Sequence, residues 1–241
     1  TGVFLVVPAK TDIAELLPTL PFAAAITAYW AAARFTRRKF APWPFRRSLL
    51  WCGGIAALAA AFVGPPAARA RHDFVAHMTA HLLIGMAGPL LLSQAAPITL
   101  LLRVMSPKAA RRLARLLKSR PLAALGHPLT AATLHISGLW PLYTTNLYAA
   151  MHHHAGLYAF VHLHLFLAGY LFSAAMIGTD PSPHRAGFVL RACVMITAFG
   201  LHDTLAKIVY AHPPPGVPPA QAEAGAMLMV YAGDLIELPL I

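Results

Sequence analysis

The stretch HDFVAHMTAHLLIGMAGPLLL, residues 72–92, decides the fold class of this chain. It opens with three histidines, His72, His77 and His81, and continues as an apolar run. A run of this kind is long enough for a helix to cross a hydrocarbon core about 30 Å thick. Ionisable side chains are costly inside a membrane and usually mark function. The stretch therefore predicts a membrane-spanning helix that carries imidazoles for a chemical purpose.

The composition of the whole chain agrees with this prediction. Of the 241 residues, 58% are hydrophobic and only 11% are charged, whereas soluble domains carry roughly 25% charged residues. The apolar runs show no period-two alternation of the kind that a transmembrane barrel requires. We therefore expect an all-α, polytopic membrane protein that forms one integral-membrane domain over residues 1–241.

Seven hydrophobic segments can be drawn along the chain, and we expect a bundle of seven transmembrane helices. Prolines punctuate the first and third segments, where helix kinks are expected. The PPPGVPP stretch at 213–219 is an extended connector and cannot be helical. The predicted spans are 12–33, 47–64, 74–96, 122–143, 155–178, 187–210 and 222–241.

The basic residues predict the orientation of the bundle. The loops 34–47, 103–120 and 179–191 hold fifteen of the 19 Lys and Arg residues, and the opposite side holds only four. Because basic loops stay in the cytoplasm, we expect the N-terminus outside and the C-terminus in the cytoplasm of a bacterial plasma membrane. The net charge of +11 is thus explained by topology, and a nucleic-acid partner is not expected. Segment 106–120 is either an amphipathic helix on the inner leaflet or a solvated basic loop.

This orientation places histidines from four spans in one layer, about 5–14 Å below the outer surface at 1.5 Å per helical residue. His77 and His81 are four residues apart on one helix face and could bind one metal ion together. His162 and His164 lie on nearly opposite helix faces, so only one of them is expected to face the interior. A single buried histidine can also be purely structural. The candidate ligands in the layer are His77, His81, His135, one of His162 and His164, His202 and Asp203.

An outer loop adds a second group of metal-binding side chains, Met151, His152, His153 and His154. Zinc would accept imidazoles with a carboxylate. Copper binds imidazole more tightly, and thioether sulfur favours its reduced form. Paired histidines on neighbouring helices could instead hold haem. The methionines near the outer side favour copper, with the loop 151–154 capturing it from the extracytoplasmic space.

Two carboxylates lie deeper in the predicted bundle. Asp234 and Glu237 share one face of the last span, about 18 Å or more from the outer side at the helical rise. A carboxylate at that depth needs a partner or a proton. Asp234 either anchors the bundle or relays protons or ions, and the second possibility would make the protein a transporter.

Several motifs together resemble a known family. HMTAHLLIGMAGPLLLSQAAPITLLLR (77–103), HLFLAGYLF (164–172), GTDPSPHR (178–185) and AQAEAGAMLMVYAGDLIEL (220–238) are similar to segments of the CtaG-type cytochrome c oxidase assembly factors. The family pattern carries over to His77, His81, His164, His202 and Asp234. It usually has Trp-His-x-Pro after the fourth span, where this chain has Trp140 followed directly by Pro141. His135 or the loop histidines would then substitute.

The resemblance implies a role in supplying copper during maturation of a terminal oxidase. We therefore expect a copper-binding assembly factor, not an enzyme, that passes copper to an oxidase subunit by ligand exchange. Its partners would be that subunit, the lipid bilayer and a possible second copy of the chain. The alternatives are a haem-binding electron carrier and a metal or proton transporter that uses Asp234.

Overall fold

The computed structural model describes residues 17–237, and within that range every regular element is helical. The long helices correspond in position to the segments predicted from hydrophobicity. Residues 12–16 and 238–241 of the first and last predicted spans lie outside the described range. The long helices are α2 (Leu20–Thr36), α3 (Phe45–Phe62), the continuous run α5–η2–α6 (Phe74–Leu82, Leu83–Ala87, Gly88–Gln94), α10 (Pro128–Thr144), α12 (Ala155–Ile177), α13 (Phe188–Ala211) and α14 (Pro219–Glu237).

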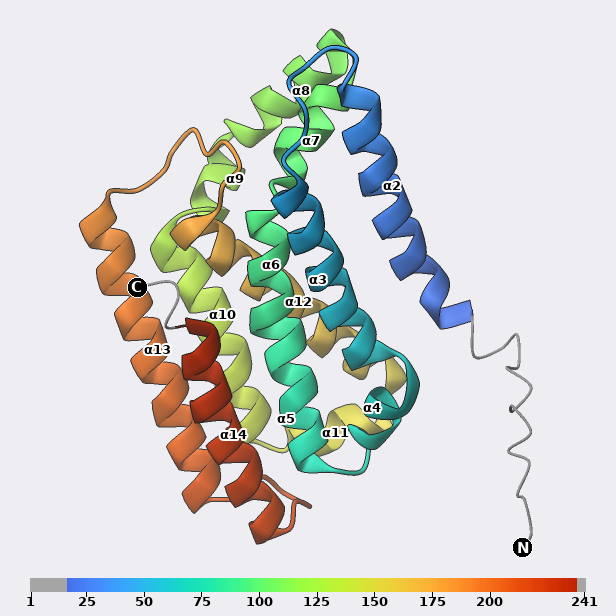
Figure 1. The fold of residues 1–241 in the computed structure, drawn as a ribbon. Helices are drawn as coiled ribbons and strands as arrows, with labels where there is room; N and C mark the ends of the chain where they lie inside the picture. The colour runs from blue at the N-terminus through green and yellow to red at the C-terminus, as the bar shows by residue number, and fades with distance from the viewer. Residues whose placement is uncertain (1–16, 238–241) are drawn as a thin grey trace, which may run out of the picture.

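The α5–η2–α6 run stands at the centre of the bundle (Figure 1). Its α5 half packs against α14, and its α6 half packs against α3 and α12. Helices α10, α12, α13 and α14 complete the wall around it, because α10 packs against both α12 and α13, and α13 packs against α14. The helix that carries the quoted histidines is therefore the most enclosed element.

A π-helical turn, η2, interrupts this central helix between Leu83 and Ala87. Pro89 follows it, and a proline cannot donate to the carbonyl four residues earlier, here that of Gly85. The Gly85 carbonyl instead lies against Gly169 of α12, so closely that a β-carbon at position 169 would overlap it. The proline opens the helix locally, and a glycine on the neighbouring helix accommodates the freed carbonyl.

Within residues 17–237, three helices are long and apolar enough to cross a membrane: Phe74–Gln94, Ala155–Ile177 and Phe188–Ala211. The membrane nature of the protein is thus confirmed by length and composition. The count of seven spans and the orientation of the termini remain predictions.

The short helices gather at opposite ends of the bundle (Figure 1). At one end lie α7 (Pro97–Val104), α8 (Pro107–Leu117) and α9 (Arg120–Leu125), and at the other lie α4 (Gly64–Arg69) and α11 (Leu147–His153). Asp180 holds α7 in place by accepting hydrogen bonds from the backbone N–H groups of Ile98 and Thr99 and from the Thr99 hydroxyl. Helix α8 covers most of segment 106–120, so this segment is largely helical.

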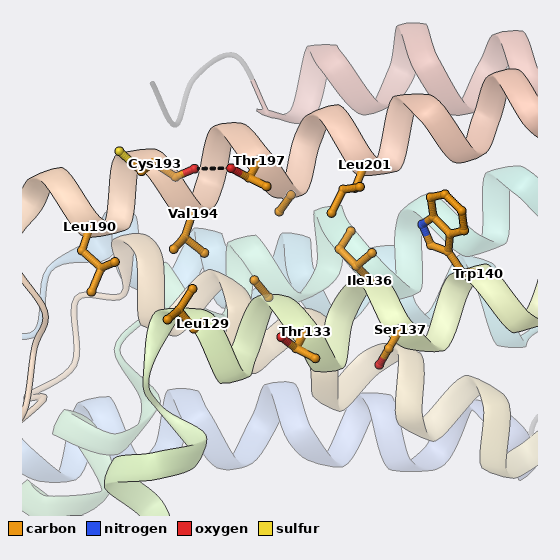
Figure 2. Close-up of a pocket in the computed structure, with 12 residues that line it drawn as sticks. Leu129, Thr133, Ile136, Ser137, Trp140, Leu190, Cys193, Val194, Thr197 and Leu201 are labelled. Atoms are coloured by element: carbon orange, nitrogen blue, oxygen red, sulfur yellow. Dashed lines mark hydrogen bonds between the residues drawn. The ribbon is translucent and has the colours of Figure 1, made fainter.

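A groove of about 610 Å³ lies between α10 and α13 (Figure 2). Thr197 donates its hydroxyl hydrogen to the Cys193 carbonyl within the same helix, which leaves the lining mainly apolar. None of the histidines lines this groove. An apolar, laterally open groove in a membrane helix bundle fits hydrocarbon better than an ion. Its lining residues include Leu129, Ile136, Trp140, Leu190, Val194 and Leu201.

Candidate metal centre

Five imidazoles are buried inside the helix bundle, each with 5% or less of its surface exposed. They come from α5, α10, α12 and α13, so four separate helices contribute. A neutral imidazole in a core usually finds a hydrogen-bond partner for at least one nitrogen. These five residues are His77, His81, His135, His162 and His202.

His81 of α5 and His202 of α13 form the inner pair of this cluster. Their ring centroids are 6.0 Å apart, and neither nitrogen of either ring has a hydrogen-bond partner. Leaving a buried polar atom unpartnered costs free energy that a bound ligand can recover. The nearest carboxylate oxygen, Oδ1 of Asp203, is 4.0 Å from Nδ1 of His202 and is itself unpartnered.

His77, His152 and His162 form an outer group around the start of α5. The His77 ring centroid lies 6.2 Å from that of His152 and 6.4 Å from that of His162. His152 and His162 each donate Nδ1–H to the carbonyl four residues earlier, that of Tyr148 and that of Tyr158, at 2.8 Å. Such a bond orients the ring and leaves Nε2 free to bind a metal. The Nε2 atom of His152 is buried and unpartnered.

Tyr143 of α10 lies between the two groups. Its hydroxyl is 3.1 Å from Nε2 of His77, and its ring centroid is 5.9 Å from that of His81. Tyr148, in the short helix α11, covers His77 with ring centroids 4.9 Å apart. Burial raises the pKa of Tyr148 to about 12, so its hydroxyl is protonated at neutral pH.

Several other predicted ligands have neighbours outside these two groups. His164 points to the α10 contact, where Nε2–H donates to the Leu134 carbonyl at 3.2 Å. His135 stacks on Phe172 with centroids 5.1 Å apart and keeps one unpartnered nitrogen, Nδ1. His153 and His154 are exposed at the end of α11.

The remaining predicted residues occupy mixed environments. Met151 is buried, with 1% of its surface exposed, and so packs in the core instead of standing free in a loop. Asp203 is partly exposed on α13, and Asp234 is partly buried on α14. Glu237 ends α14, and its side chain lies outside the described part of the structure.

The sequence leaves His162 and His164 as alternatives on one helix, and the family resemblance favours His164. The structure brings His162, not His164, to the outer group. The signal was present in the spacing, since the buried residues of α12 recur every three or four positions from His162. That buried series is His162, Leu165, Ala168, Gly169, Phe172, Ser173 and Met176. Tyr143 was missed because nothing in its local sequence marks it.

Among residues 17–237, no three or more His, Cys, Asp or Glu side chains are arranged to hold one metal ion. The tetrahedral set that structural zinc prefers is therefore absent from the described residues. What the structure does present is pairs of imidazoles, of which the inner pair has every nitrogen available.

The fold and the buried imidazoles define a helical membrane protein with polar groups enclosed in its core. Residues 27–241 match the family described as cytochrome c oxidase caa3 assembly factor, Caa3_CtaG. The match covers most of the chain, and the chain belongs to this family. The resemblance noted in the sequence is thereby confirmed.

Curated relatives come from mycobacteria and are named only as uncharacterized proteins. The chain is 34% identical over 184 residues to proteins of Mycobacterium bovis and Mycobacterium tuberculosis, which covers 72% of this chain and 27% of each relative. It is 30% identical over 175 residues to a Mycobacterium leprae protein, covering 69% of this chain and 26% of the relative. The matched segment thus spans about a quarter of each relative's length. No solved structure matches the chain.

Proposed function

We propose that this protein binds copper through its buried histidines and delivers it to a subunit of a cytochrome c oxidase during assembly. The family supports a role in assembling the oxidase. Copper is the cargo in this proposal, and transfer proceeds by exchange of ligands without a catalytic nucleophile. The protein would work as a multi-pass protein of the bacterial plasma membrane.

The observation that carries the proposal is the inner pair, His81 and His202. Four ring nitrogens lie buried without a hydrogen-bond partner, although structural histidines in cores are normally satisfied. A bound ion would satisfy a nitrogen on each ring at once. Copper has a higher affinity for imidazole than the other divalent first-row metals, including zinc.

The outer group supplies the access route to the inner pair. His152 lies in α11, next to a hollow of about 510 Å³ that is also lined by Arg71, His72 and His153. His77 is next to His152 and, on α5, precedes His81 by one helical turn. An ion could therefore pass from the hollow by successive exchange between neighbouring imidazoles.

Elemental analysis of detergent-purified protein tests the proposal. We expect copper to co-purify with the wild-type chain and to be lost from the His77→Ala/His81→Ala variant, which removes one ring from each group. His127→Ala/His184→Ala, which changes histidines outside both groups, is the matched control and should keep its copper. Equal copper in all three proteins, or none in the wild type, would refute copper binding at these histidines.

Two further measurements address the alternatives. A haem carrier would show a Soret absorption band, and we expect purified protein without one. A transporter that uses Asp234 would drive copper uptake into sealed vesicles that Asp234→Asn abolishes, and we expect no such uptake. In cells, the His77→Ala/His81→Ala variant should lower the copper content of the purified oxidase.

A further inference from the structure

The side chain of Met86 reaches the same space as the ring of His202, one member of the inner pair. Met86 belongs to the π-helical turn η2 and is buried, with 7% of its surface exposed. A β-carbon added at Gly233 would lie 3.2 Å from Cε1 of His202 and 4.0 Å from the methyl carbon Cε of Met86. The methyl end of Met86 and the imidazole of His202 therefore both border the space that the absent side chain of Gly233 leaves.

The π-turn sets where this thioether lies. One extra residue in the turn rotates Met86 relative to the α-helical register that His77 and His81 share. Such turns occur often at functional sites. The turn is flanked by Pro89 and by the close contact between Gly85 and Gly169, which fix the local path of the backbone.

The resulting donor set discriminates between metals. Two neutral imidazoles and one thioether offer no carboxylate or thiolate charge and too few donors for tetrahedral zinc or tetragonal Cu(II). Thioether sulfur selects Cu(I), which is stable with few ligands.

We propose that His81, His202 and Met86 form a binding site for Cu(I), with Asp203 as a positioning residue for the His202 ring. The inference rests on the proposed copper function and adds the oxidation state and the sulfur ligand. Oδ1 of Asp203 lies 4.0 Å from Nδ1 of His202, too far for a hydrogen bond, but its negative charge favours a proton on that nitrogen, which leaves Nε2 for the metal. Gly233 leaves room for the ring, since a side chain there would press on Cε1.

Anaerobic titration with Cu(I), in competition with the chromophoric chelator bicinchoninate, tests the site. The background should be Cys52→Ser/Cys193→Ser, because both cysteines are free and thiolates bind Cu(I) strongly. Met86→Leu preserves side-chain volume but removes the sulfur, and we expect the affinity to fall about tenfold or more. Met176→Leu changes an equally buried methionine in the separate α12–α13 cluster and should bind as the parent does.

X-ray absorption at the copper edge supplies the direct readout. The parent should show nitrogen scatterers and one sulfur scatterer, and Met86→Leu should lose only the sulfur. Asp203→Asn should keep both ligand types but lower the affinity by about tenfold. Circular dichroism and size-exclusion profiles that match the parent confirm that the variants fold.

The outcomes separate the two proposals. Copper bound by nitrogen alone in the parent, or equal affinity in Met86→Leu and Met176→Leu, would overturn the cuprous site while copper binding itself stands. A parent protein that binds no Cu(I) would overturn both. Loss of binding in His202→Ala together with a sulfur signal that depends on Met86 supports the site.

Discussion

At the scale of single residues, Gly233 of α14 leaves room for the His202 ring of the candidate centre. A methyl group there would lie 3.2 Å from Cε1 of His202, closer than ordinary van der Waals contact. The ring would have to move by a few tenths of an ångström, and metal sites tolerate little misplacement of a ligand. Glycine is thus required by the neighbouring ring and not by backbone conformation.

We therefore predict that Gly233→Ala lowers the copper content of purified protein with little change in its helical signal. The matched control is Gly200→Ala, since a β-carbon at position 200 meets nothing within 4 Å. Copper analysis and circular dichroism together check the prediction. Unchanged copper in Gly233→Ala would show that the position of His202 does not control binding.

The hydrogen-bonded carboxylate of Asp180 gives a second prediction at this scale. It accepts from two backbone N–H groups at the start of α7 and from the Thr99 hydroxyl. Asp180→Ala should lower stability by about 1–2 kcal/mol, as loss of a helix cap does. Thermal unfolding in detergent measures the effect, and Glu223→Gln, at an exposed position of α14, is the control that should unfold as the wild type does.

At the scale of elements, the contact between α12 and the π-turn is the tightest helix crossing near the centre. A β-carbon at Gly169 would overlap the carbonyl oxygen of Gly85 and lie 3.2 Å from Cγ of Pro89. Neither the backbone nor the proline ring can give way easily. The helices can approach this closely only because position 169 has no side chain.

Gly169→Ala should therefore destabilise the protein by about 1–3 kcal/mol through overpacking. Gly200→Ala, in the open middle of α13, should instead be neutral or stabilise it by roughly 0.5–1 kcal/mol, because glycine disfavours helix interiors. Denaturation of both variants in the same detergent compares them. An equal response would mean that the helices can separate at this crossing without cost.

The hydrophobic pattern predicts where the long helices lie, but it does not predict the π-turn inside one of them. The predicted span 74–96 is a helix, yet the π-turn inside it depends on where α12 packs. The buried face of α12 was readable from its 3.6-residue period, and that period selects His162. The family motif favours His164 instead, but in the structure the His164 ring contacts α10 and lies outside the outer group.

At the scale of the whole molecule, the bundle has one end with basic helices and one end with histidines. Helix α8 exposes Arg111, Arg112 and Arg115 at the first end, and α11 exposes His153 and His154 at the second. Basic segments remain on the cytoplasmic side. The predicted orientation therefore puts the histidine end outside.

Labelling of intact cells checks this orientation. In the Cys52→Ser/Cys193→Ser background, a cysteine placed at Gly216 should react with a membrane-impermeant maleimide from outside. A cysteine at Ser119 should react only after the membrane is permeabilised. The reverse pattern would invert the bundle and place the histidines at the cytoplasmic face.

Sequence alone determined that the chain is helical, lies in a membrane, belongs to the assembly-factor family and carries buried imidazoles. These properties follow from composition, hydrophobic period and local motifs, all of which act over a few neighbouring residues. Only the tertiary structure decided which imidazoles meet: His81 with His202, and His77 with His152 and His162. The pairing depends on how each helix is rotated about its axis, and that rotation is set by contacts such as Gly85 against Gly169 between segments far apart in the chain.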